Sequence, residues 1–115
     1  MKRQYRLRKN ADFQQVRRMG QSKSTRLMVL VALPNHLSHS RFGFAVSKRI
    51  GNAVRRNKVK RQMREAARLF FEQFQPGWDL LFIARAPIRR ASYADIEQSV
   101  RHLAQMLNLV KGAND

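Results

Sequence analysis

The segment between residues 41 and 68 constrains this chain most, because it combines dense positive charge with the apolar spacing of an amphipathic helix. It holds ten Lys or Arg residues and one acid, Glu65. Apolar residues recur at helical intervals, so one broad stripe can be buried while another side stays exposed. The predicted buried stripe comprises Val54, Val59, Met63, Ala66, Ala67, Phe70 and Phe74. The predicted exposed side comprises Arg56, Lys60, Arg64 and Arg68, with Asn57 and Arg61 beside them. Such a row of like charges on a folded surface indicates an anionic partner.

Length and charge narrow the class of protein. The 115 residues suffice for one domain with a modest core, and a hydrophobic content of 43% excludes a disordered basic tail. The formal charge of +17 is uneven, because residues 1–26 carry +8, residues 27–68 carry +9 and residues 69–115 are neutral. We therefore expect the first two-thirds to form the binding surface and the last third to act as scaffold. Nucleic acid is the commonest partner for such a surface, although the net charge alone also fits acidic membrane lipids.

Catalysis by the protein itself lacks a sequence signal. The chain has no Cys, which excludes disulfides, thiol chemistry and Cys-ligated zinc. Its seven acids are scattered, it has no glycine-rich phosphate loop, and His36 and His39 fit a solvated loop better than a metal site. We expect no catalytic residue and no metal ligand in the protein. No apolar run is as long as a membrane span and no signal-peptide segment follows the basic N-terminus, so we expect a cytoplasmic protein.

The first half of the chain predicts a short helix and two strands. The helix runs from Asn10, its candidate N-cap, to about Met19. Residues 26–33 and 41–47 form the strands, and a hairpin between them is the simplest pairing. Both alternating sets of residues 26–33 are apolar, which is typical of a strand covered on both faces.

The second half predicts two long helices around a third strand. The basic helix follows a candidate cap, Asn52, and runs to about Phe74. Residues 79–86 form a largely buried strand. A capping box formed by Ser92 and Asp95 starts the last helix. The apolar positions of that helix are Ile96, Val100, Leu103, Leu107 and Val110.

The element order α-β-β-α-β-α predicts an α+β fold, a single-domain α-β sandwich over residues 1–115. The two long helices cover one face of a small sheet, and the short N-terminal helix lies towards the other. We expect residues 1–9 to be a basic, flexible lead-in and residues 111–115 to be a frayed tail.

Two groups of residues are candidate binding sites. Arg and Lys side chains make charge-assisted bonds to phosphates, and Arg does so bidentately. The first group comprises Arg56, Lys60, Arg61 and Arg64. The second group is an apolar platform on the less covered sheet face, where unpaired bases could stack, and core packing is an equally good interpretation of it. It comprises Phe13, Val29 and Val31, flanked by Arg6, Arg8 and Lys9.

The segment from Ser47 to Arg64 resembles the signature segment of the bacterial ribonuclease P protein subunit. The residues that match its motif are Arg56, Asn57, Lys60, Arg61 and Arg64, after the lead-in Gly51-Asn52-Ala53-Val54. Residues 7–13 resemble the N-terminal element of that family, and the Pro-Gly pair and last helix also fit. The resemblance therefore extends over nearly the whole chain.

The resemblance implies a left-handed crossover from the second predicted strand through the basic helix to the third. It also implies that the protein joins a catalytic RNA, the ribonuclease P RNA, and helps to remove the 5′ leader from precursor tRNA. The RNA would perform the hydrolysis with Mg²⁺, and the protein alone would be inactive. The resemblance implies no membrane and no obligate protein partner.

The residues and the resemblance together predict two surfaces. The surface for the catalytic RNA comprises Lys48, Arg49, Asn52, Arg55, Arg56, Asn57, Lys60, Arg61, Arg64 and Arg68. The cleft for the leader comprises Arg8, Lys9, Phe13, Val29 and Val31. Arg17 stands where the family sometimes has a second aromatic residue, so we expect leader binding to depend more on charge than on stacking.

Two other functions fit parts of the sequence. A basic ribosomal protein or RNA chaperone would share the charge and the α/β pattern without a role in cleavage. A protein-only nuclease would cleave RNA without an RNA subunit. A sequence-specific DNA regulator is disfavoured, because strands flank the basic helix and no helix-turn-helix pair is evident.

Overall fold

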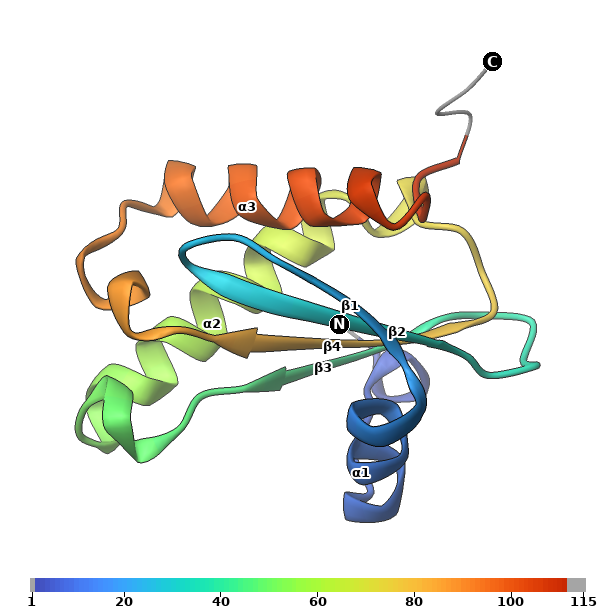
Figure 1. Ribbon diagram of the computed structural model, residues 1–115, viewed down its shortest axis with the longest axis horizontal. Helices are drawn as coiled ribbons and strands as arrows, with labels where there is room; N and C mark the ends of the chain where they lie inside the picture. The colour runs from blue at the N-terminus through green and yellow to red at the C-terminus, as the bar shows by residue number, and fades with distance from the viewer. Residues whose placement is uncertain (1, 112–115) are drawn as a thin grey trace.

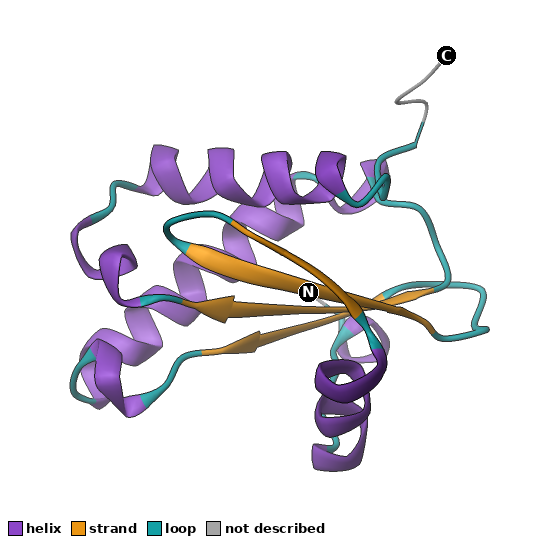
Figure 2. Ribbon diagram, viewed as in Figure 1, coloured by secondary structure: helices purple, strands orange, loops and turns teal. Residues whose placement is uncertain are grey.

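The computed structural model describes residues 2–111, which form three α-helices and four β-strands (Figures 1 and 2). In chain order these elements are α1 (Asn10–Met19), β1 (Gln21–Ser24), β2 (Met28–Pro34), β3 (Arg41–Ala45), α2 (Ala53–Leu69), β4 (Trp78–Ala84) and α3 (Tyr93–Met106). Short 3₁₀ helices lie between them, namely η1 (Arg3–Tyr5), η2 (Lys48–Ile50), η3 (Phe71–Gln73) and η4 (Ala86–Arg90).

The four strands form one mixed sheet in the order β1-β2-β4-β3. β2 pairs antiparallel with both β1 and β4, whereas β3 and β4 are parallel. The predicted hairpin between residues 26–33 and 41–47 is therefore wrong, because β4 lies between these strands. Leu80, Leu81 and Phe82 of β4 are all fully buried, so this strand takes a central position where both faces are covered.

β1 was missing from the prediction. Its sequence Gln-Ser-Lys-Ser has no apolar alternation, and all four residues are exposed. The strand forms at the sheet edge because its backbone pairs with β2, from Gln21 opposite Ala32 to Ser24 opposite Val29. Sequence patterns report the burial of side chains, so they do not detect such a polar edge strand.

Helices cover the two faces of the sheet as predicted. α2 and α3 lie on one face and α1 lies on the other (Figure 1). The larger core, between the sheet and the two long helices, contains Met28, Leu30 and Phe82. A smaller core under α1 contains Val16 and Val31. The alternating residues of β2 therefore pack into different cores, which explains why both sets are apolar. The fold belongs to the α+β class.

The basic helix begins as predicted and ends earlier. The Asn52 side chain accepts a hydrogen bond from the Arg55 N–H at 2.9 Å, which confirms it as the N-cap. The helix ends at Leu69, and Phe74 stays buried beyond the turn η3. Val54 is 79% exposed, contrary to the predicted stripe, because it lies about 140° around the helix axis from Val59. The connection from β3 through α2 to β4 joins two parallel strands, and its left-handed sense stays a prediction.

The ends of the other two helices differ in part from the prediction. Lys9, not Asn10, occupies the N-cap position of α1, and its side chain makes no capping hydrogen bond. The capping box of α3 is confirmed, with the Asp95 N–H donating to Ser92 Oγ at 3.1 Å. α3 ends at Met106, so the predicted helical position Val110 lies beyond it.

Both ends of the described segment, residues 2–111, make contacts with the rest of the domain. Leu7 is buried, and its N–H donates to the Phe42 carbonyl at 2.8 Å, while the Tyr5 ring meets Phe71 edge to face at 4.6 Å. Tyr5 and Leu7, within the lead-in predicted as flexible, therefore pack against η3 and β3, and the flexibility of residues 1–9 stays a prediction. Of the predicted frayed tail, residues 112–115 lie outside the described residues, and the Lys111 N–H donates to the Gln73 carbonyl. No helix within residues 2–111 is long and apolar enough to span a bilayer.

Candidate nucleic-acid interface

The exposed side of α2 carries the cationic row that the sequence predicts. Arg56, Lys60 and Arg64 follow one another at intervals of four residues and are half-buried, while Arg61 is exposed beside them. Among residues 2–111, no carboxylate lies within ion-pairing distance of any of these four side chains. Their positive charges are therefore not neutralised within the described part of the protein and remain available to an anion.

Arg68 differs from the rest of this row. Its Nε donates to Glu65 Oε2 at 3.0 Å, and its Nη2 donates to the other carboxylate oxygen. The hydrogen bonds from Arg68 lower the pKa of the exposed Glu65 carboxyl. Because this i,i+3 pair balances the Arg68 charge, the residue is a weaker candidate for RNA contact than the sequence suggests.

A short turn brings more cations to the start of α2. Lys48 and Arg49 are exposed in η2, and Arg55 is exposed in the first turn of α2. Gly51 between them has φ +149°, and a Cβ there would lie 2.8 Å from Arg55 Cδ, so only glycine fits this turn easily. Asn52 uses its side-chain oxygen for the helix cap, which gives this predicted RNA-binding residue a structural role.

On the sheet face under α1, the residues predicted to form the leader cleft differ in burial. Val31 is only 6% exposed and belongs to the core under α1, so it presents little surface to a bound leader. Val29 is half-buried, opposite Ile83, which in turn pairs with Ala45. These three residues form a partly exposed apolar row across β2, β4 and β3. The sequence alone does not place Ile83 and Ala45 in this row, because their positions depend on the strand order.

Phe13 lies where α1 approaches β3. A Cβ at Gly43 would lie 2.8 Å from Phe13 Cε1, so the absence of a side chain on Gly43 lets the ring rest against the strand. Arg41 fixes α1 near this point, since it binds Asp79 through two hydrogen bonds, at 2.6 and 2.8 Å, and reaches Asp12 of α1 at 3.4 Å. The bond to Asp79 raises the pKa of the Arg41 guanidinium.

A cavity at the outer edge of β3 connects the two predicted surfaces. It has a volume of about 200 Å³, and it draws on the N-terminal segment, α1, β3 and α2. Its lining residues are Arg6, Leu7, Arg8, Phe13, Phe42, Gly43, Phe44, Lys60 and Arg64. The Arg64 guanidinium carbon lies 6.0 Å from the centre of the Phe44 ring, within reach of a cation–π contact. The structure thus brings Arg8 and Phe13 together with Lys60 and Arg64. Lys9 is exposed at the start of α1 and does not line this cavity.

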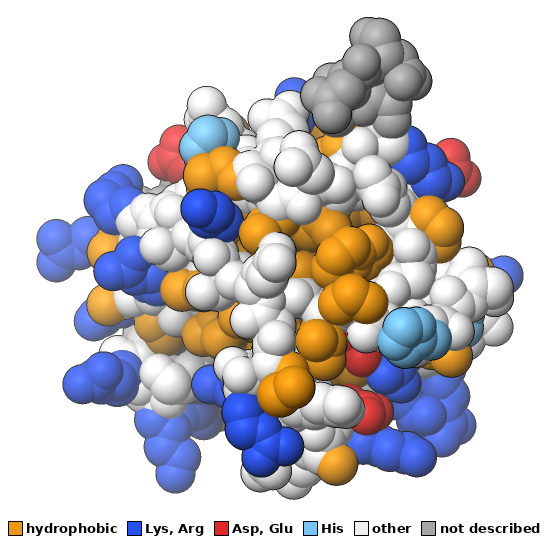
Figure 3. Space-filling view, turned by 45° about the vertical axis from the view of Figure 1, so that its right-hand side comes forward, with side chains coloured by type: hydrophobic (Ala, Val, Ile, Leu, Met, Phe, Trp, Pro, Cys, Tyr) orange, Lys and Arg blue, Asp and Glu red, His pale blue; other side chains and the backbone are white. Residues whose placement is uncertain are grey.

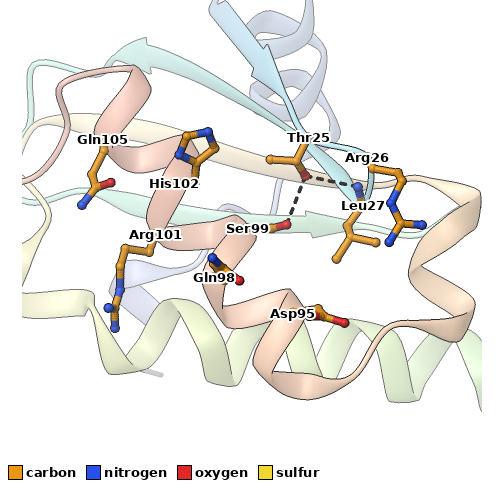
Figure 4. Close-up of a pocket in the computed structure, with 9 residues that line it drawn as sticks. All are labelled: Thr25, Arg26, Leu27, Asp95, Gln98, Ser99, Arg101, His102 and Gln105. Carbon is orange, nitrogen blue, oxygen red and sulfur yellow. Dashed lines mark hydrogen bonds between the residues drawn. The ribbon is translucent and has the colours of Figure 1, made fainter.

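A second cavity, of about 500 Å³, lies between α3 and the β1–β2 turn (Figure 4). Its side chains include Thr25, which donates to Ser99 Oγ at 3.2 Å, and Arg101, which pairs with Glu97 and packs on Phe70. No residue predicted for either binding surface lines it. Within residues 2–111, no group of three His, Cys, Asp or Glu side chains is placed to hold a metal ion.

The fold and this site define a class of small, basic α+β domain with unneutralised cations on one helix and a partly exposed apolar row on the opposite sheet face. A family model described as Ribonuclease P matches residues 1–108. The chain belongs to the bacterial ribonuclease P protein family.

Relatives and solved structures agree with this membership. The chain is 44% identical to the ribonuclease P protein component of Roseiflexus castenholzii, over 98% of this chain and 93% of the relative. It is 45% identical to the ribonuclease P protein component of Herpetosiphon aurantiacus, over 95% of this chain and 89% of that relative. The structure of the Staphylococcus aureus RNase P protein superposes with a TM-score of 0.86 at 35% identity, covering 93% of this chain and 98% of that one. The structure of the Thermotoga maritima RNase P protein superposes with a TM-score of 0.81 at 28% identity, covering 88% of this chain and 96% of that one.

Proposed function

We propose that this protein is the subunit of a ribonucleoprotein endonuclease that removes the 5′ leader from precursor tRNA in the cytoplasm. The observation that supports this most strongly is the row of cations on α2 without carboxylate partners, in a chain that belongs to the ribonuclease P protein family. The cations bind phosphates of the catalytic RNA, and rigid placement on a helix fixes where those phosphates lie.

The leader of the substrate binds on the other side of β3. Its unpaired bases pack on the row formed by Val29, Ile83 and Ala45 and on the ring of Phe13. Arg8 and Lys60 at the edge cavity attract its phosphates. The adjacency of this cavity to the α2 row supports a single RNA-binding region that holds the catalytic RNA and the leader side by side.

The hydrolysis belongs to the RNA in this proposal. Mg²⁺ supplies charge stabilisation and an activated water in phosphodiester cleavage. In this proposal the Mg²⁺ sites of the assembled enzyme lie among RNA phosphates. The protein contributes by screening phosphate repulsion between RNA and substrate and by positioning the leader.

Reconstitution of precursor-tRNA cleavage tests the proposal. The purified protein is added to ribonuclease P RNA at low Mg²⁺, where repulsion between the two RNAs is strongest, and cleavage is measured with and without the protein. We expect the protein to restore correct 5′ cleavage. Binding to ribosomal RNA without any effect on cleavage would instead identify a ribosomal protein or chaperone.

A second candidate function comes from one related structure. A mutant of the S. aureus RNase P protein is described as having defective mRNA degradation activity. The two chains are 34% identical, and the match covers 92% of this chain and 90% of the mutant. The corresponding candidate here is degradation of single-stranded RNA by the protein itself. Incubation of the protein alone with an mRNA fragment distinguishes the two candidate functions. Cleavage without any RNA subunit would favour the second.

A further inference from the structure

The last third of the chain has no net charge, yet its arginines are not evenly spread. Arg89 and Arg90 follow one another in η4, immediately after β4. In Figure 1 η4, in orange, lies beside η2, in green, at the left of the molecule, and the two segments are in contact. The Arg55 side chain joins them, because its Nη1 donates to the Arg89 carbonyl at 3.2 Å.

Folding therefore gathers five exposed cations from distant parts of the chain. We call this set the η2–η4 surface, which comprises Lys48, Arg49, Arg55, Arg89 and Arg90. None of the five has a carboxylate within ion-pairing distance among residues 2–111. Lys and Arg side chains also gather along the left rim of the space-filling view, away from the apolar centre of that face (Figure 3).

The acids within residues 69–111 form no ion pair with this surface. Asp79 lies at the opposite end of β4 and binds Arg41. Asp95 and Glu97, at the start of α3, are the first two acids that follow η4 in the chain. The Asp95 carboxylate accepts from the Ser92 N–H in the capping box, and Glu97 pairs with Arg101 at 3.6 Å.

We propose that Arg89 and Arg90 bind phosphates of the catalytic RNA and extend the α2 contact around the start of that helix. The inference rests on the proposed function, because it requires an RNA subunit. A folded RNA is the fitting partner, since it presents phosphates at fixed spacing across a broad surface. The η2–η4 surface has no aromatic residue on which an unpaired leader base could stack.

A pair of substitutions that removes both positive charges tests this role. Arg89→Gln with Arg90→Gln should weaken binding of ribonuclease P RNA roughly tenfold at about 0.15 M salt and reduce the salt slope by about one to two units. Arg89→Lys with Arg90→Lys should keep most of the affinity, because the charges remain. The matched control, Lys2→Gln with Lys111→Gln, removes two charges near η3 at the other end of α2 and should leave the slope nearly unchanged.

The outcomes separate this inference from the proposed function. If the wild-type protein neither binds the RNA subunit nor promotes cleavage, the proposed function fails. If the wild-type protein does both and the Gln pair behaves like the control pair, only the inference is overturned. A loss confined to precursor-tRNA affinity would assign the surface to the substrate and overturn it as well.

A measurement on the wild-type protein makes the test independent of variant folding. Arginine-specific modification followed by peptide mass mapping reports the reactivity of Arg89 and Arg90. We expect the RNA subunit to protect both, and precursor tRNA alone to protect neither. Full reactivity of both arginines in the complex would overturn the inference.

Discussion

At the scale of single residues, Phe13 owes its position to a neighbour without a side chain. Its ring rests against Gly43 of β3, and its helix is tied to the sheet through Arg41 and Asp12. The ring is half-buried, so one part of it packs in the smaller core while another part lines the edge cavity. Its role in core packing and its proposed role in binding are therefore both open to measurement.

Replacement of Phe13 distinguishes these two roles. We expect Phe13→Ala to weaken binding of precursor tRNA to the reconstituted enzyme roughly tenfold, because stacking on an aromatic ring stabilises a base by about 1–3 kcal/mol. Binding of mature tRNA, which has no leader, should change little. Val16→Ala is the matched control, since Val16 is fully buried under α1 and cannot touch a ligand. Equal losses for both tRNAs would remove Phe13 from the leader cleft.

The α2 row makes a different prediction, because cations act through charge. Arg56→Ala with Arg61→Ala should weaken binding of the catalytic RNA and flatten its salt dependence by about one to two slope units. Titration of binding at several salt concentrations measures this slope. Arg68→Ala serves for comparison, and we expect a smaller effect from it because Glu65 already balances that charge. A double variant with the wild-type slope would contradict the assignment of this face.

At the scale of elements, α2 depends on its first turn. Asn52 caps the helix, and the turn before it requires glycine at residue 51. The cations of η2 and of the first helical turn keep their relative positions only while this turn is intact. Asn52 consequently supports the proposed RNA-binding surface through helix geometry, whether or not it touches RNA.

The capping role of Asn52 can be measured directly. Asn52→Ala should lower the free energy of unfolding by about 1 kcal/mol, whereas Asn52→Ser should keep most of the stability because Ser also caps helices. Urea denaturation followed by circular dichroism gives both values. Asn57→Ala, at an exposed position inside the same helix, is the control and should change stability by less than about 0.5 kcal/mol. Equal stability of Asn52→Ala and the wild type would exclude a significant cap.

At the scale of the whole molecule, the net charge of +17 opposes folding. The chain has 24 basic residues and only seven acids, and three of those acids pair with Arg41 or Arg68. The remaining cations repel one another across a domain with a radius of gyration of 13.2 Å, which is comparable to the Debye length of about 10 Å at 0.1 M salt. Their repulsion is the electrostatic cost of the surface that we propose binds RNA.

Stability should therefore rise with ionic strength. We expect the Tm of the free protein to increase between about 20 mM and about 500 mM NaCl, because salt screens the repulsion between its cations. Thermal unfolding followed by circular dichroism measures this shift. The variant with Arg56→Ala and Arg61→Ala should show a smaller increase, since it carries two fewer charges. A Tm that falls with salt would contradict this account.

Side-chain patterns determined much of this protein from the sequence alone. The class of fold, the two helical layers, the cap at Asn52 and the capping box at Ser92 follow from periodicity and local hydrogen bonding, which act over a few residues. The cationic row on α2 was also predictable, because residues four apart on a helix share a face.

Only the tertiary structure decided what depends on contacts between distant segments. The place of β4 between β2 and β3 overturned the predicted hairpin and brought Ile83 beside Val29. The folded chain also buried Val31 and carried Arg89 to the start of α2. Strand order and surface charge clusters arise from packing across the whole chain, and no local pattern of residues encodes them.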